Sequence, residues 1–485
     1  MHCRHTKAPA RKMFLLSAHL MLAVLVIALL ALSAGAAQEQ MFGRLFPELP
    51  AYNAPTDAAL DALTTAGTPT SPGPLLDDGA VTGNNPDGVR AFFTYFGQFL
   101  DHDMTLDTLP LPVDFVDPNT IVNSREQRLN LDSVYGSRKR PNPALYEADG
   151  KHLRVGGPNG RDLPRDSTGT AIVGDPRNDE NQVIAQIHVA FLRAHNRLVA
   201  DGFKFEDARQ LMEWRHQWIV VHEFLPEVLD PDVYADVFGA EGDGPIKTRF
   251  YDFKKAEKAE MPVEFSVGAY RFGHSQVRAA YRLIEGGPFV QVFNPSAPDD
   301  LRGGRPIASD HVIFWPNFLS VDGLAPAVNI SRKIDTLLSA GLFTLPIPGA
   351  EASGSAILAK RNIQRARQYG LPSGQAVATR LGLDVLTNEE IAAAIPRLAA
   401  LLGDAFKTPG SNVAEAPLWL YILAESQIVH DGAKLGPTGS RIVAEVIGGL
   451  LAADKNSYVR RGFVPAGGSF RVQDLLVEAG VLQLP

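Results

Sequence analysis

The alternation of hydrophobic and polar residues along this chain predicts a mainly helical (mainly α) protein. From residue 86 onward, apolar residues recur at the three- and four-residue spacing that gives a helix one apolar face. Alternating strand patterns are few and short, and segments rich in Pro and Gly connect the helical patterns. The predicted helices cover residues 86–103, 175–201, 204–224, 266–283, 353–368, 388–402, 415–429 and 439–453.

The same pattern divides the chain into a leader, an arm and one large domain. Residues 38–85 are rich in Pro, Gly, Thr and Asn and have no sustained periodicity, so we expect an extended N-terminal arm. No repeat and no sharp linker interrupts residues 86–485. We therefore expect this region to form a single large domain with few short strands.

Residues 1–37 have the composition of an export signal. Basic residues between positions 4 and 12 precede an apolar run, Leu20 to Leu32, and small residues in an A-x-A pattern follow it. One interpretation is a cleaved signal peptide. The other is an uncleaved membrane anchor, because the looser apolar stretch 13–37 is long enough to span a bilayer. Both predict a secreted or otherwise extracytoplasmic protein.

Composition narrows the chemistry further. The chain has 46 Lys and Arg against 54 Asp and Glu, with no basic block, so nucleic acid is not an expected partner. The single cysteine, Cys3, lies in the predicted leader. The mature chain would then have no disulfide, no thiolate nucleophile and no thiolate-ligated haem.

The segment GQFLDHD (97–103) places three polar residues at the end of an apolar helix. On a helical projection, Gln98 and His102 are neighbours on a face of small residues, opposite a stripe of bulky side chains. Asp101 and Asp103 project about 100° to either side of His102. Asp103 lies beside the bulky stripe, where an unpaired carboxylate is costly, so we expect a cation near it. The alternative is a polar helix end that faces solvent.

Four further stretches complete a pattern that resembles the animal-type haem peroxidases, the peroxidase–cyclooxygenase superfamily, and its bacterial members in particular. Taken alone, each has a simpler interpretation, such as a turn, an acidic helix start or a packed histidine. Their common order carries the resemblance, which runs from about residue 85 to beyond 460. The stretches are RLNLDSVYGS (128–137), GDPRNDENQ (174–182), AYRFGHSQVR (269–278) and RNIQRARQYGLPSG (361–374).

The resemblance implies haem b as the cofactor, with its distal side formed by two of these stretches. It identifies His102 as the distal histidine, Gln98 as its neighbour over the haem, and Arg177 as the distal arginine. Asp101 and Glu180 match the carboxylates that form ester bonds to haem methyl groups in some family members. Either or both would make such a bond here.

On the proximal side, the resemblance identifies His274 as the ligand of the haem iron. Asn362 would accept the hydrogen bond of the imidazole N–H, which orients the ring and makes it a stronger ligand. Arg271 and Arg365 would contact the haem propionates. Four other histidines are interpreted as packing or surface residues: His188, His195, His216 and His222.

The resemblance also implies a calcium site. Asp103 would be one ligand, and the loop around residues 128–132 would complete the shell of six to eight oxygens that calcium prefers. Arg128 would contribute its carbonyl, and Asn130 and Asp132 their side chains. Many family members carry an acid at the position of Asn130, so the amide weakens the expected site.

Together these residues imply an exported haem peroxidase that reduces hydrogen peroxide while oxidising a small donor such as a halide or a phenol. One alternative is a fatty-acid dioxygenase of the same superfamily, whose radical-forming tyrosine stands three residues before the proximal histidine. Arg271 occupies that position here, and Tyr270 stands four residues before His274. The other alternative is an inactive binding module, which predicts loss of the catalytic residues that this sequence retains.

Overall fold

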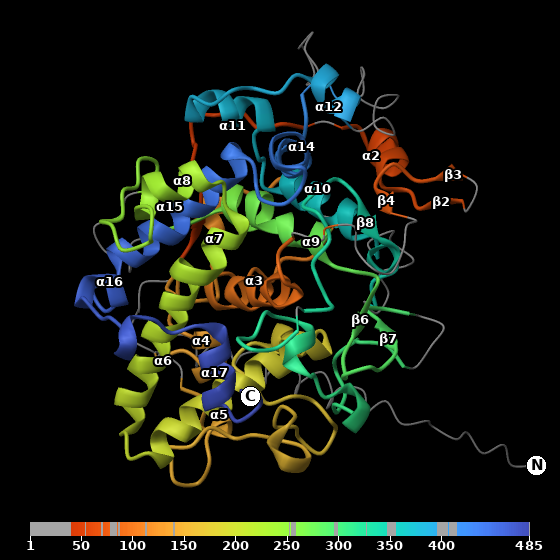
Figure 1. The fold of residues 1–485 in the computed structure, drawn as a ribbon. Coiled ribbons are helices and arrows are strands. Elements are labelled where there is room, and N and C mark those ends of the chain that lie inside the picture. Colours follow the sequence, from red (N-terminus) through yellow and green to blue (C-terminus); the bar gives the residue numbers. More distant parts are fainter. Residues whose placement is uncertain are drawn as a thin grey trace, which may run out of the picture. The chain divides into compact units, whose positions relative to one another are not determined.

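The computed structural model confirms a mainly α fold with few short strands (Figure 1). It describes residues 40–484 except 54, 69–70, 78–84, 86–87, 112–113, 139–140, 252, 254–258, 295–298, 326, 347–355, 395–405 and 407–414. The predicted leader, residues 1–37, lies outside the described residues. Contacts group the chain from Gln40 to Pro485 into one unit.

The helices that the structure describes in this unit include the longer ones that the sequence predicts and several short ones that it does not. They are α2 (Asp57–Thr64), α3 (Ala91–Met104), α4 (Asp132–Tyr135), α5 (Gln182–Ala200), α6 (Phe205–Ile219), α7 (Leu225–Val228), α8 (Pro231–Phe238), α9 (Gly273–Gln276), α10 (Leu358–Gln368), α11 (Gly374–Leu381), α12 (Asn388–Ala394), α14 (Leu418–His430), α15 (Pro437–Ala453), α16 (Tyr458–Arg461) and α17 (Val472–Glu478).

The strands are two or three residues long and form four separate pairs in the described residues. Two pairs are parallel, β1 (Phe42–Gly43) with β5 (Met261–Pro262), and β4 (Leu76–Asp77) with β8 (Leu338–Ser339). The other two are antiparallel, β2 (Gly67–Thr68) with β3 (Ser71–Pro72), and β6 (Ala280–Arg282) with β7 (Phe289–Gln291).

Differences from the predicted elements include the start of α3, the end of the predicted helix 266–283 and a helix within the predicted arm. Helix α3 begins at Ala91 and not at residue 86, because Arg90 is extended and pairs with Ile330 in an isolated bridge. The predicted helix 266–283 ends at Gln276, and residues 280–282 form strand β6 instead. Within the predicted extended arm, residues 57–64 form helix α2, which buries Leu60 and Leu63 in the core.

Helix α3 lies in the interior, and α5 and α9 pack against it (Figure 1). Its bulky stripe is buried as predicted, and Phe92, Phe96 and Phe99 are all 0% exposed. The opposite face is buried as well, since Thr94 and His102 are also shielded from solvent. A helix buried on both faces needs partners for its polar groups, which excludes the interpretation of a solvent-facing helix end.

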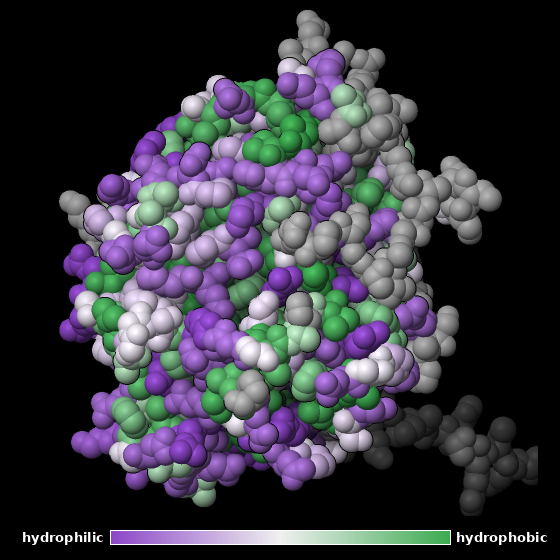
Figure 2. Space-filling view, viewed as in Figure 1, coloured by the Kyte–Doolittle hydropathy of each residue, from purple (hydrophilic) through white to green (hydrophobic). Residues whose placement is uncertain are grey.

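The surface shows the usual mixture of residue types. In Figure 2, hydrophobic residues are interspersed with hydrophilic ones over the described part of the visible face. No helix in the described part of the chain is long and apolar enough to span a lipid bilayer.

Candidate active site

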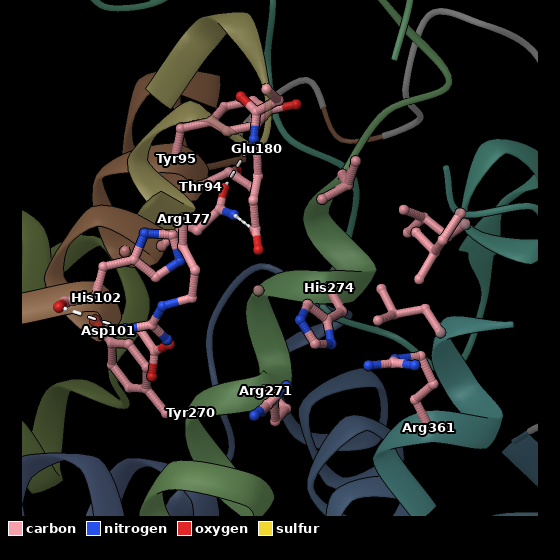
Figure 3. A pocket seen from close by; sticks show the side chains of 18 of the residues that line it. Thr94, Tyr95, Asp101, His102, Arg177, Glu180, Tyr270, Arg271, His274 and Arg361 are labelled. Carbon is pink, nitrogen blue, oxygen red and sulfur yellow. Dashed lines mark hydrogen bonds and ion pairs between the residues drawn. The ribbon is translucent and has the colours of Figure 1, made fainter. Parts of the chain in front are cut away.

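A cavity of about 580 Å³ lies beside α3 and is walled by residues from several distant segments. The walls come from α3, from the 3₁₀ turn η4 (Pro176–Asp179), from the 3₁₀ turn η8 (Ala269–Phe272) with α9, and from α10. In Figure 3, His102 and Arg177 lie on one side and His274 and Arg361 on the other. Eight predicted haem-site residues line the cavity: Gln98, Asp101, His102, Arg177, Glu180, Arg271, His274 and Arg365.

His102 is held as a neutral base at the end of α3. Its Nδ1 lies 2.8 Å from Oδ1 of Asn178, which leaves Nε2 as the other ring nitrogen in the cavity wall. Burial and the positive charge of Arg177 lower the pKa of His102 to about 3. The imidazole is therefore uncharged at neutral pH, the form in which it accepts a proton.

Arg177 is fixed by Asp175, the N-cap residue of the turn that carries Arg177. Asp175 caps η4 by accepting the backbone N–H of Arg177, and its carboxylate also binds the guanidinium at 2.8 Å. Nη2 of Arg177 additionally donates to the carbonyl of Thr105, and Nη1 lies 3.5 Å from the carboxylate of Asp101. The guanidinium is thus charged and oriented between α3 and the cavity.

The two carboxylates that resemble ester-forming residues both reach the cavity, with different partners. Asp101 accepts a hydrogen bond from the hydroxyl of Thr105 at 2.9 Å. Glu180 accepts one from Nε2 of Gln98 at 3.2 Å, while Oε1 of Gln98 accepts from Asn181 at 3.1 Å. Burial raises the pKa of Asp101, and it raises that of Glu180 to about 6.

His274 has the geometry of a metal ligand oriented by an amide. Its Nδ1 lies 3.0 Å from the side-chain amide of Asn362, whose Oδ1 has no other partner in the described residues. Rotating this amide by 180° lets Oδ1 accept the N–H of Nδ1, which leaves the Nε2 lone pair for a metal. Burial lowers the pKa of His274 to about 3, so the ring is neutral, as a ligand must be.

Positive charge gathers beside His274. Arg271, Arg361 and Arg365 line the same part of the cavity wall. Burial lowers the pKa of Arg361, and the neighbouring charges of Arg365 and Arg271 lower it further. Arginines that repel one another in a buried wall suit an anionic ligand, and the two propionates of haem provide such charge. The residues present therefore fit haem.

The predicted calcium ligands also meet, at the end of α3 facing away from the cavity. Asp103 is fully buried and accepts the backbone N–H groups of Leu131 at 2.9 Å and Ser133 at 3.4 Å. Burial raises the pKa of Asp103 to about 7, and burial together with the charge of Asp103 raises that of Asp132. Two adjacent buried carboxylates favour a bound cation.

Two buried oxygens of the loop accept no hydrogen bond in the described residues: Oδ1 of Asn130 and Oδ1 of Asp132. Oδ1 of Asp132 lies 3.8 Å from Nη1 of Arg125. The side chain of Arg128 points to Asp454, at 3.6 Å, so only its carbonyl is offered to the loop. In the described chain, no group of three or more His, Cys, Asp or Glu side chains is arranged to hold a metal alone. The loop therefore fits calcium only with amide and carbonyl oxygens in the shell.

The sequence did not predict three residues that lie at or near the cavity. Asn178 contacts His102, Arg125 binds the carboxylate of Asp175 at 2.8 Å, and Arg361 lines the wall beside His274. Asn178 and Arg361 are next to predicted site residues, but helical spacing does not indicate which way they point. Arg125 precedes the predicted calcium loop and had no signal of its own.

Comparisons with known proteins identify relatives of this chain. Rat thyroid peroxidase is 27% identical over 319 residues, covering 59% of this chain and 31% of that protein. Peroxinectin A from Dictyostelium discoideum is 27% identical over 303 residues, covering 59% of this chain and 50% of that protein. The chain thus spans between 31% and 50% of the length of these relatives.

Solved structures show the same fold. Peroxidase A from Dictyostelium discoideum superposes with a TM-score of 0.63 at 19% identity, over 92% of this chain and 94% of that one. The fatty acid alpha-dioxygenase of Oryza sativa gives a TM-score of 0.59 at 16% identity, over 92% and 78%. At these identities the likeness concerns the fold alone.

The family model described as animal haem peroxidase matches residues 108–462, which is most of the chain. The match begins after the GQFLDHD segment, so it does not include the residues of α3. Haem is the cofactor that this family implies. The chain belongs to the animal haem peroxidase family.

Proposed function

We propose that this protein is an exported haem peroxidase that reduces hydrogen peroxide and oxidises a small donor, such as a halide or a phenol. The observation that carries the proposal is one cavity in which a neutral His102 and a charged Arg177 face a neutral, amide-oriented His274. Export rests on the predicted leader alone.

Each residue has a defined task in this proposal. Haem, bound through His274 and the arginine cluster, would supply the redox-active iron that peroxide needs. Nε2 of His102 takes a proton from peroxide and returns it to the departing oxygen. Arg177 stays protonated and stabilises the negative charge that develops as the O–O bond breaks. Asp175 and Asn362 hold Arg177 and His274 in place.

The proposal includes two further features of the site. Asp101 or Glu180, or both, would link haem covalently through ester bonds. Calcium at Asp103 would stabilise the end of α3. Because the preceding residue is His102, the ion would also help to position the base.

Absorption spectroscopy tests the proposal directly. Purified protein, expressed with ample haem, should show a Soret band that changes within seconds of adding peroxide. His274→Ala should lose the haem, whereas His102→Ala should keep it and lose about 100-fold or more in the rate of the peroxide reaction. A colourless wild-type protein contradicts the proposal. Rapid oxygen uptake with a fatty acid, without peroxide-driven oxidation of halide or phenol, would favour the dioxygenase alternative.

A further inference from the structure

A chain of hydrogen bonds leads from His102 into the core, away from the cavity. Nδ1 of His102 is 2.8 Å from Oδ1 of Asn178, and Nδ2 of Asn178 is 2.9 Å from Nδ1 of His188. Asn178 is 0% and His188 1% exposed, and neither is among the described residues that line the cavity. His188, interpreted from the sequence as a packing or surface residue, therefore contacts the partner of the proposed base.

The chemistry of the three groups sets the direction of these bonds. Nδ1 of each buried ring contacts one atom of the Asn178 side chain, the oxygen in the case of His102 and the nitrogen in the case of His188. A carboxamide oxygen only accepts and a carboxamide nitrogen only donates. His102 therefore donates from Nδ1 to Asn178, and Asn178 donates to the lone pair on Nδ1 of His188.

We propose that Asn178 and His188 are positioning residues that hold His102 in the tautomer with its proton on Nδ1 and its lone pair on Nε2. The proposal rests on the function proposed above. The opposite tautomer would present an N–H to peroxide where a base is needed. Asn178 sets the tautomer by accepting from Nδ1 of His102.

His188 acts one step further from the cavity. Its Nδ1 lone pair accepts from the NH₂ group of Asn178 and so keeps the amide oxygen turned toward His102. Without this acceptor, the amide is free to rotate by 180° and point its NH₂ group at Nδ1 of His102. That orientation favours the tautomer with the proton on Nε2.

Ligand binding at the haem separates this role from simple packing. Hydrogen cyanide must give up its proton when it binds ferric haem, whereas carbon monoxide binds ferrous haem without moving a proton. In haem-loaded Asn178→Leu, which keeps the side-chain volume, we expect cyanide association and the peroxide reaction to slow by about 100-fold. Carbon monoxide association, haem content and the KM for the donor should stay as in the wild type.

A second variant tests the outer half of the chain. His188→Phe should slow cyanide association by about 10-fold, in the range for the loss of an outer partner of a site residue. The double variant should be no slower than Asn178→Leu, because both changes act through one tautomer. Asn196→Leu is the matched control, since it removes a partly buried amide on the same helix α5 that bonds only the backbone of Leu153 in the described residues.

Several outcomes would overturn the proposal. Equal slowing of cyanide and carbon monoxide in Asn178→Leu would indicate a distorted pocket, and no slowing of cyanide would show that the tautomer does not depend on Asn178. If that variant fails to fold, wild-type cyanide kinetics in His188→Phe contradict the proposal on their own. A wild-type enzyme that binds haem and cyanide but does not react with peroxide contradicts the proposed function instead.

Discussion

Asp175 binds Arg177 through both of its carboxylate oxygens. Oδ1 accepts the backbone N–H of Arg177 at 2.9 Å and its Nε–H at 3.1 Å, and Oδ2 accepts Nη2 at 2.8 Å. Oδ2 also binds Arg125 at 2.8 Å. Burial alone would raise the pKa of Asp175, but the charge and hydrogen bonds of Arg177, together with His102 and Arg125, lower it to about 2. One buried anion thus serves two cations.

Asp175→Asn should therefore affect both stability and reactivity. The amide keeps the shape but leaves two arginines short of one negative charge, and breaking a buried pair in this way costs about 3–5 kcal/mol. Arg177 loses its anchor, so the reaction with peroxide should slow as well. Denaturant unfolding measures the first effect and stopped-flow absorption the second.

An exposed ion pair provides the control for Asp175→Asn. Asp322 pairs with Arg471 at the surface, where the two side chains are 65% and 44% exposed. Asp322→Asn should cost less than about 1 kcal/mol and leave the peroxide reaction unchanged. If the two variants lose equal stability, the carboxylate of Asp175 does not stabilise the fold by pairing with Arg177 and Arg125.

His216 is a second buried group with a measurable consequence. It lies among Phe96, Phe99 and Phe191, is fully buried, and neither ring nitrogen has a hydrogen-bond partner in the described residues. Burial lowers its pKa to about 3. The unfolded chain binds a proton at this histidine below about pH 6.5 and the folded one does not, so stability falls as the pH drops from about 6.5 to 3.

His216→Phe should remove this contribution. The slope of the unfolding free energy against pH should decrease by about 1.4 kcal/mol per pH unit in that window. At pH 8 the substitution should leave this slope nearly unchanged. Denaturant unfolding at several pH values checks both expectations. An unchanged slope would mean that His216 is already protonated in the folded state, for example by pairing with Asp103, whose carboxylate lies 3.9 Å away.

Helical spacing predicted the parts of the site that share one element. Gln98 and His102 follow from a four-residue spacing on α3. The resemblance supplied the residues that meet across the cavity, such as His102 and His274. Spacing alone could not do so, because it relates only positions within one helix or strand.

The sequence alone could not predict contacts between distant segments. The bond from His102 to Asn178 joins residues 76 positions apart. The same limit explains the wrong helix over 266–283: residues 280–282 become a strand because 289–291 pair with them, and no local pattern reveals that partner. Burial of the small face of α3 likewise depends on segments that fold around it.

Removal of calcium is expected to destabilise the end of α3. The loop offers Asp103, Asp132 and the unpaired oxygen of Asn130, so prolonged chelation should release the ion and lower the melting temperature, and added calcium should restore it. A ligand at 100 times its Kd stabilises by about 2.7 kcal/mol. Calorimetry with and without chelator, combined with metal analysis, measures both effects.

Asp103→Asn should abolish the response to chelator, whereas Asp166→Asn should keep it. Asp166 is a suitable control because it is an exposed carboxylate whose hydrogen bonds in the described residues are all to its own turn, residues 168–170. The prediction is wrong if the protein contains no calcium after purification in its presence and melts at the same temperature with chelator. The backbone N–H groups of Leu131 and Ser133 would then stabilise the carboxylate of Asp103 without an ion.

The ester bonds to haem are expected to depend more on Glu180 than on Asp101. Asp101 is held by the hydroxyl of Thr105 and lies 3.5 Å from Arg177, whereas in the described residues the carboxylate of Glu180 accepts one hydrogen bond, from Gln98 at 3.2 Å. Glu180 is therefore freer to reach the haem edge. Acid–acetone extraction after turnover with peroxide should release little haem from the wild type and most of it from Glu180→Gln. Asp101→Asn should give an intermediate release. Free extraction of haem from the wild type would exclude both links. Greater release from Asp101→Asn than from Glu180→Gln would show that Asp101 contributes the more important ester bond.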